Sequence, residues 1–357
     1  MRKISVSQIQ GGEILGKPLY DDHGRILLAK GIILKPGYKM RLTQMCILSV
    51  YIDDELSKGV EMKDFLSEET REETKGIIRK EFKNFLTNSN TSSTKIINTV
   101  SKVIDEILSR DEVIINICDI KSKDQYIYEH CVNVCGLSII MGIHLGYSKS
   151  HLEELAVGAL LHDLGKLITP EDILNKYMTG EISKDEMDII KKHPLDGYEI
   201  LNEKSGISYI SKAIILMHHE HYNGTGYPLG LKDDKLHETV KLVSICNTFD
   251  NLISDFPGKK KMEVYEALEY ITAMSNILFD KKLVDIFVKN VAAYPSGTLI
   301  ILNTDEKGIV LKQNKQLPSR PIINILVDKD GVKLKEPRQL DLSQETTLFI
   351  IDTLNTL

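Results

Sequence analysis

The hydrophobic positions in the middle of this chain recur at the spacing of α-helices. In residues 61–110, one apolar stripe lies opposite charged residues that are spaced for salt bridges, which predicts a helical lead-in and a candidate homodimer contact. Residues 111–292 keep the helical pattern, and the apolar run at 152–160 predicts a helix that packs against a core. This middle part is therefore expected to be an all-α domain.

Several helix starts carry capping signals. Ser150 with Glu153, and Ser183 with Glu186, have the spacing of a capping box. At 169–172 the order Thr-Pro-Glu-Asp predicts a cap, a first-turn proline and an acidic first turn. Each signal predicts where a helix of the middle domain begins.

Both ends of the chain change to strand patterning. Residues 1–57 predict a small α+β module, with strands at 4–6, 14–15, 26–28 and 48–52, a helix at 37–44 and a hairpin turn at 21–24. Residues 293–357 predict a β-rich extension that serves packing, with strands at 298–302, 308–312, 322–327 and 347–351. The expected fold is mainly α, with a small α+β module before the helical domain and a small β-rich extension after it.

Composition narrows the class of protein. With 42% hydrophobic residues, the chain can bury a substantial core and is long enough for two or three domains. Its net charge of -6 argues against nucleic acid as a partner, because a polyanionic backbone would repel it. No signal peptide and no membrane-spanning run is expected. The absence of a CxxC pair favours reduced thiols in the cytoplasm over a thiolate metal site; the cysteines are Cys46, Cys118, Cys131, Cys135 and Cys246.

Histidines and an aspartate are the candidate metal ligands. His162 and Asp163 follow the apolar run at 152–160, so both are expected to be carried into the core, where charge needs a partner. Gly165 is expected to end the helix and to leave Lys166 just beyond it, placed to hold a phosphate oxygen or to steady a leaving group. Imidazole with carboxylate suits iron, manganese or zinc.

A pair of adjacent histidines extends this candidate site. His218 and His219 project roughly 100° apart on a helix, so they can bind one metal together only near a helix C-terminus, which the turn-rich residues 223–226 predict. One carboxylate such as Asp163 can bridge two metals about 3.5 to 4 Å apart, with a bridging hydroxide as the nucleophile. The pattern therefore indicates phosphoester hydrolysis.

Four segments contain these residues: EHCVNV around His130, LLHDLGKL at 160–167, KKHP at 191–194 and HHEHYNGTGYP at 218–228. They resemble the HD-GYP family, a branch of the HD phosphohydrolases whose active bacterial members hydrolyse the second messenger cyclic di-GMP to pGpG or GMP. The resemblance implies an HD-type helical catalytic domain that holds two divalent transition-metal ions, iron or manganese.

The resemblance also implies a role for each matching residue. The first metal would be held by His130, His162 and Asp163, and the second by Asp163, His193, His218 and His219. Asp163 and Lys166 are the expected catalytic residues, and Lys166 would contact a substrate phosphate. The exposed loop Gly226-Tyr227-Pro228 would present Tyr227 to the substrate or to a signalling-protein partner.

The chain departs from the family pattern at the first metal. Where the family reads A-D-x-x-D-A-L, this chain has Cys246-Asn247-Thr248-Phe249-Asp250-Asn251-Leu252, so Asn247 replaces the acid that completes the set of ligands. An amide oxygen can still coordinate, but it carries no charge, so metal affinity should fall. Asp250 lies one turn away on the same helical face and is not evidently a replacement.

Two further positions differ from the family. The family segment R-P-Y-[KR] appears as Phe256-Pro257-Gly258-Lys259, so the arginine is lost and Lys259 remains as the candidate phosphate contact. Tyr126 stands where three-metal members carry a glutamate, which favours a two-metal site.

Two main interpretations therefore stay open. The first is a cyclic di-GMP phosphodiesterase whose activity is weakened by Asn247 and Phe256. The alternative is a catalytically degenerate module that binds nucleotide or metal and signals through a partner. Hydrolysis of another cyclic dinucleotide or of a phosphomonoester is a third possibility, because the arginine is missing.

Overall fold

The computed structural model of the chain describes residues 1–21, 24–45, 47–60, 62, 64–87, 92–110, 126–202, 204, 206–254, 261–314 and 316–356. Its contacts divide it into two compact units, a helical unit of residues 66–113 and 125–288 and a β-containing unit formed by the two ends of the chain. The expected hairpin turn at 21–24 falls partly outside the described residues, as do Cys46, Cys118, Phe256 and Lys259.

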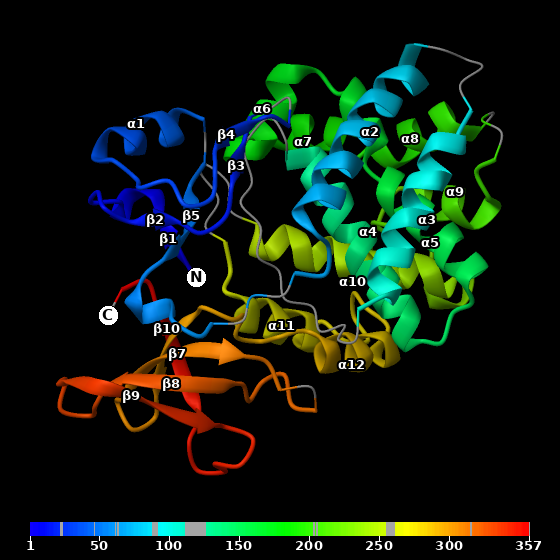
Figure 1. Cartoon of the computed structure of the whole chain (residues 1–357). Helices are drawn as coiled ribbons and strands as arrows, with labels where there is room; N and C mark the ends of the chain where they lie inside the picture. The colour runs from blue at the N-terminus through cyan, green and yellow to red at the C-terminus, as the bar shows by residue number, and fades with distance from the viewer. Residues whose placement is uncertain are drawn as a thin grey trace. The chain divides into compact units, whose positions relative to one another are not determined.

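The helical unit confirms the expected mainly α core (Figure 1). Its α-helices are α2 Glu68–Thr87, α3 Thr94–Leu108, α4 Tyr126–His144, α5 Lys149–Leu161, α6 Glu171–Thr179, α7 Lys184–Ile190, α8 His193–Asn202, α9 Tyr209–Met217, α10 Glu238–Ile253, α11 Val264–Ala273 and α12 Lys281–Asn290. Two short 3-10 helices, η4 Leu164–Ile168 and η5 Asp233–Lys235, connect some of them.

Helix α4 is the central helix of this unit. Every residue from Tyr126 to Gly142 is buried, and the helix packs against α2, α3, α5 and α10. A helix that is apolar on all sides is stable in water only inside a core. By length and composition α4 could also cross a membrane, so the expectation that no run reaches that length was wrong; 89% of its apolar window is nevertheless buried inside the protein, as in a core helix.

Helix starts agree only partly with the sequence signals. Ser183 and Glu186 form the expected capping box at the start of α7. The cap of α5 instead lies two residues before the predicted one, because the Ser148 side chain, not that of Ser150, accepts the hydrogen bond from the backbone of His151. At α6 the residue before the helix is Pro170, with no side-chain cap from Thr169.

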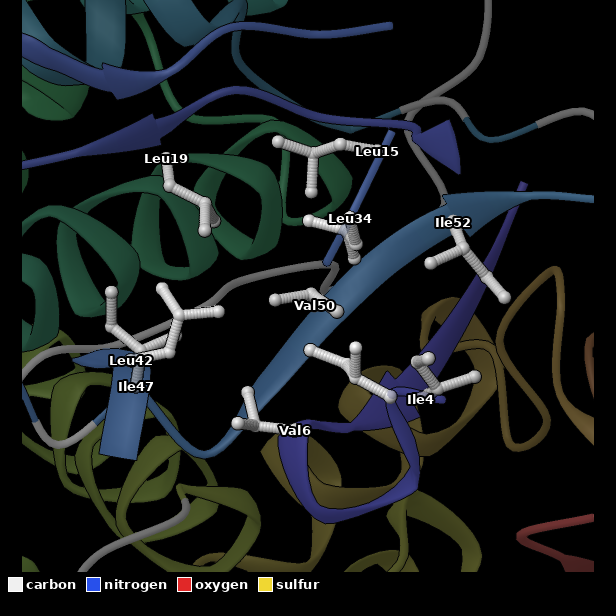
Figure 2. Close-up of a cluster of buried hydrophobic side chains, with 10 residues drawn as sticks. Ile4, Val6, Leu15, Leu19, Leu34, Leu42, Ile47, Val50 and Ile52 are labelled. Carbon is white, nitrogen blue, oxygen red and sulfur yellow. The ribbon is translucent and has the colours of Figure 1, made fainter. Parts of the chain in front are cut away.

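The N-terminal part of the β-containing unit is the expected α+β module. Strands β1 (Arg2–Ser5), β5 (Ser49–Asp53) and β2 (Ile14–Leu15) form one antiparallel sheet, and β3 (Leu19–Tyr20) pairs with β4 (Ile26–Leu28). Two short 3-10 helices, η1 (Val6–Gln8) and η2 (Glu55–Ser57), and helix α1 (Pro36–Gln44) complete it. Figure 2 shows its apolar core, in which Leu15, Leu34 and Val50 are fully buried.

The C-terminal part is a five-stranded antiparallel sheet in the order β10-β6-β7-β8-β9. Its strands are β6 Leu299–Leu302, β7 Lys307–Lys312, β8 Ile322–Val327, β9 Lys333–Asp341 and β10 Ile350–Leu354. The sequence pattern missed β9, because its side chains are mostly exposed and show no apolar alternation. It also placed the last strand too early, at 347–351.

Candidate metal centre

The candidate ligands sit at helix ends and in one central helix. His130 comes from the middle of α4, whereas His162 and Asp163 follow the last turn of α5. His193 begins α8, and His218 follows the last turn of α9, as expected for a pair that shares one metal. Only His219 is partly exposed; the other five ligands have 1% or less of their surface exposed.

These residues form two clusters. His130, His162 and Asp163 make one and His193, His218 and His219 make the other, with the ligand atoms of each cluster within 4.8 Å of one another. Because imidazole and carboxylate are the ligands that transition metals prefer, the clusters are compatible with a binuclear metal site.

Asp163 lies between the clusters. Its Oδ2 is 3.6 Å from His130 Nε2 and 3.5 Å from His162 Nε2. Its Oδ1 faces the other way, 3.2 Å from His193 Nε2 and 3.9 Å from His218 Nε2. One carboxylate oxygen therefore faces each cluster, which is the arrangement that a bridging ligand requires.

Hydrogen bonds determine which ring nitrogen of each histidine carries the proton. The Nδ1 atoms of His162, His193 and His218 lie 2.8, 2.7 and 2.9 Å from the carbonyl oxygens three residues before them. A carbonyl oxygen only accepts, so each Nδ1 donates and each Nε2 keeps its lone pair. This assignment follows from the partners of the rings.

The Nε2 lone pairs face one another. His162 Nε2 is 3.2 Å from His130 Nε2, and His193 Nε2 is 3.1 Å from His218 Nε2. Burial lowers the pKa of His162 to about 3 and that of His218 well below its ordinary value, so neither ring takes a proton near neutral pH. Facing lone pairs repel unless a cation lies between them.

The buried acceptor of Asp163 supports the same conclusion. Its Oδ1 is buried and accepts no hydrogen bond. Burial favours the neutral acid, but His162 and Lys166 outweigh that effect and hold the pKa of Asp163 well below its usual range, so the carboxylate is charged. A buried, charged and unpaired acceptor is costly, and a metal ion would remove the cost. The donor set therefore fits two metals.

Lys166 lies beside the bridge. Its Nζ is 2.7 Å from Asp163 Oδ2, and although burial would lower the pKa of Lys166, the Asp163 carboxylate raises it, so the ammonium stays charged. Its Nζ also lies 5.6 Å from the ring centroid of Tyr177 in α6. Tyr177 was not a sequence candidate, since a single tyrosine on an amphipathic helix carries no signal for a site.

Gly165 has a different role from the one expected. It lies inside η4 and does not end a helix. A Cβ at this position would be 2.0 Å from the His193 carbonyl oxygen and 2.7 Å from the Gly197 nitrogen. Glycine is thus required for the close approach of η4 to the start of α8, which brings Asp163 and His193 together.

His130 is oriented by a side chain that the sequence analysis did not assign. Its Nδ1 lies 2.6 Å from Asp250 Oδ2, so it donates to that carboxylate in place of a backbone carbonyl. Asp250 Oδ1 in turn accepts from the Asn133 amide at 3.0 Å. Asp250 therefore does not replace the missing ligand; it holds the ring of a ligand, which such carboxylates commonly do at metal sites.

The network continues to helix α2. Arg71 donates to Asn133 Oδ1 at 2.6 Å and to Glu129 Oε1 at 3.1 Å. Lys75 pairs with Glu129 Oε2 at 2.7 Å. These groups are all buried, so the helical lead-in supplies two of the charges that keep α4 in place.

Asn247 is next to the first cluster, as the resemblance implied. Its Oδ1 lies 2.9 Å from His130 Nε2 and accepts from the Asn251 amide at 2.9 Å. The side chain is 2% exposed, so water does not compete for this oxygen.

The glycine-tyrosine-proline loop folds back on the second cluster. A Cβ at Gly226 would be 2.4 Å from the His219 carbonyl oxygen, so only glycine allows this approach. The Glu220 carboxylate accepts from the backbone of 229–231 at 2.6 to 3.1 Å and holds the loop. Tyr227 stacks on His219 with ring centroids 4.6 Å apart, and Lys191 Nζ lies 5.7 Å from its centroid.

Tyr227 is accordingly half-buried, so the expectation that it is exposed on its loop was wrong. The stacking partner is a candidate metal ligand, so the tyrosine supports His219 from the loop side. Phe256, which stands in place of the family's arginine, lies outside the described residues. Lys259, the expected phosphate contact, lies outside them as well.

Comparison with known proteins gives two family matches. The model described as "HD domain" matches residues 112–283, and the model described as "KOW domain associated with HD domain" matches residues 299–356. The second match coincides with the five-stranded C-terminal sheet.

Three characterised relatives illustrate the similarity. "Cyclic di-GMP phosphodiesterase PA4108" of Pseudomonas aeruginosa is 33% identical over 218 residues, which cover 60% of this chain and 52% of the relative. "Cyclic di-GMP phosphodiesterase response regulator RpfG" of Xanthomonas campestris is 34% identical over 162 residues, or 45% of this chain and 42% of the relative. "3'3'-cGAMP-specific phosphodiesterase 1" of Vibrio cholerae is 29% identical over 192 residues, or 54% and 43%. The chain thus spans about half the length of these relatives.

Proposed function

The chain is an HD-domain protein related to the HD-GYP cyclic di-GMP phosphodiesterases, and we propose that it is itself a metal-dependent phosphodiesterase of a cyclic dinucleotide. The proposed substrate is cyclic di-GMP, and the first product is pGpG. The observation that carries the proposal is the set of histidine Nε2 atoms that converge on the Asp163 carboxylate.

The metals are proposed to be iron or manganese. His130, His162, Asp163 and the Asn247 oxygen would hold one, and Asp163, His193, His218 and His219 would hold the other. When bound, the pair would lower the pKa of water to give a nucleophile at neutral pH and would offset charge on the phosphoryl group.

The protein groups would orient the substrate. Lys166 keeps its charge in a buried position, so its ammonium would bind a phosphate oxygen and balance the charge that develops on the leaving oxygen. Lys191 and the edge of Tyr227 lie beside the second cluster and would contact the nucleotide from that side. Lys259 remains a proposed phosphate contact.

The test is hydrolysis of cyclic di-GMP by protein reconstituted anaerobically with ferrous iron, or with manganese, at high protein concentration. We expect pGpG to accumulate, and the Asp163→Asn variant to be inactive because it cannot bridge the metals with a charged group. Bound metal without loss of cyclic di-GMP would contradict the proposal. Parallel reactions with 3'3'-cGAMP and a phosphomonoester identify the preferred substrate.

A second candidate function is a binding module without turnover, because Asn247 brings no charge to the first cluster. Asn247→Asp distinguishes the two. A large gain in turnover would indicate a weakened enzyme, whereas tight binding of cyclic di-GMP without any gain would indicate a nucleotide sensor.

A further inference from the structure

Three polar residues are connected by hydrogen bonds at the first cluster. They are Tyr126, Asn247 and Asn251, from helices α4 and α10. The Tyr126 hydroxyl donates to Asn251 Oδ1 at 2.8 Å. Asn251 Nδ2 lies 2.9 Å from both the backbone oxygen and the Oδ1 of Asn247.

These contacts determine how both amides are turned. The backbone oxygen of Asn247 can only accept, so the Asn251 atom beside it is the nitrogen. The Asn251 oxygen then faces the Tyr126 hydroxyl, which can donate. Because the same Asn251 nitrogen faces the Asn247 side chain, the Asn247 atom there is the oxygen.

This orientation matters at His130. In the neutral imidazole the Nδ1–H group donates to Asp250 and Nε2 carries the lone pair, and the Asn247 oxygen lies 2.9 Å from that nitrogen. Two acceptors therefore face the position of the first metal. If the Asn247 amide were turned around, its NH2 group would donate to His130 Nε2 and occupy the lone pair that the metal needs. An aspartate has two equivalent oxygens and no such alternative.

We infer that Tyr126 and Asn251 are positioning residues, which keep the Asn247 oxygen on the metal side and prevent its amide from capping His130. The inference rests on the proposed function, because it assigns these residues to the metal site. It explains why an asparagine amide can stand in place of the family's acid without closing the site: Asn251, one turn further along α10, donates to the Asn247 oxygen, and Tyr126 of α4 in turn fixes the Asn251 amide.

The experiment is a titration of the metal-free protein with Mn²⁺ by calorimetry, in the wild type and in Asn251→Ala. We expect the affinity of one of the two sites to fall about three- to tenfold, the effect of one competing hydrogen bond, and the other site to be unchanged. Tyr126→Phe keeps the ring that stacks on His130, with centroids 5.5 Å apart, and should give a smaller loss at the same site. Tyr128→Phe, on the same helix, is the matched control and should have no effect.

Repeating the Asn251→Ala measurement in an Asn247→Asp protein distinguishes a positioning role from general destabilisation. In Asn247→Asp the ligand cannot be turned the wrong way, so adding Asn251→Ala should change the affinity less than about twofold. A loss of equal size in both backgrounds would overturn the inference, as would wild-type affinity in Asn251→Ala. Melting of the metal-free variants identifies any that are unfolded. If the wild type itself binds no Mn²⁺ or ferrous iron, the proposed function fails first.

Discussion

Two buried aspartates lie within reach of His130 and have different roles. Asp163 is charged, spans both clusters and carries an oxygen that accepts no hydrogen bond, so it is a candidate ligand. Asp250 accepts from His130 Nδ1 and from Asn133, so it is a support for a ligand. The His130 ring is oriented by a hydrogen bond to a side chain, whereas those of His162, His193 and His218 use backbone carbonyls.

We therefore predict that Asp250→Asn weakens one metal site and leaves the other intact. An amide at this position would direct an NH2 group at either the His130 N–H or the Asn133 NH2 group, so one hydrogen bond would be lost. Supports of this kind typically change metal affinity by about 10- to 100-fold. Metal content measured after dialysis at low micromolar metal should drop from two ions to one. Retention of both ions would contradict the assigned role.

At the scale of elements, the site depends on helix ends that approach closely. Gly165 in η4 contacts the first turn of α8, and Gly197 in α8 faces Gly165 in return. The carbonyl and amide groups of these segments leave no room for a side chain. The two clusters come together because η4 and α8 touch through their backbones.

We predict that Gly165→Ala separates η4 from α8 and both destabilises the protein and weakens metal binding. Overpacking of this kind typically lowers the free energy of unfolding by about 1–3 kcal/mol. Gly76→Ala in α2 is the matched control: a Cβ there meets nothing within 4 Å, and alanine favours a helix by about 1 kcal/mol. Urea unfolding measures the free energy of unfolding of both variants. An equal gain in stability from the two variants would rule out the close contact.

At the scale of the whole molecule, the helical unit buries groups that resist protonation. Burial lowers the pKa values of His162, His193, His218 and His219. The unfolded chain takes up protons on these rings near the ordinary histidine pKa of 6.5, whereas in folded His162 the pKa is about 3. The stability that the neutral rings confer is therefore fully present above pH 6.5 and is lost as the pH falls toward 3.

We predict that the metal-free protein loses stability on mild acidification. At pH 5 the free energy of unfolding should fall by about 2 kcal/mol for His162 alone, with further losses from the other three rings. Denaturant unfolding at pH 7 and pH 5 after chelation measures the loss, and saturating Mn²⁺ at pH 7 should raise the midpoint. His162→Gln should reduce the pH dependence. Equal stability at both pH values would mean that the rings are not buried in the neutral form.

The sequence by itself determined most of the kinds of element and the identity of the candidate ligands. Helical periodicity predicts which face of a segment is apolar, and the position of His162-Asp163 at the end of an apolar run places both inside the core. These are local properties, because they depend on residues within a few turns. The exposed strand β9 was missed for the same reason: it has no local pattern to recognise.

Only the tertiary structure decided how the ligands are held. The direction of an amide and the tautomer of an imidazole depend on their hydrogen-bond partners, and those of Asn251 and His130 are 125 and 120 residues away in the chain. The roles of Asp250 and of the Tyr126–Asn251 pair follow from such contacts. No pattern in one segment specifies them, because they arise where α4 and α10 pack together.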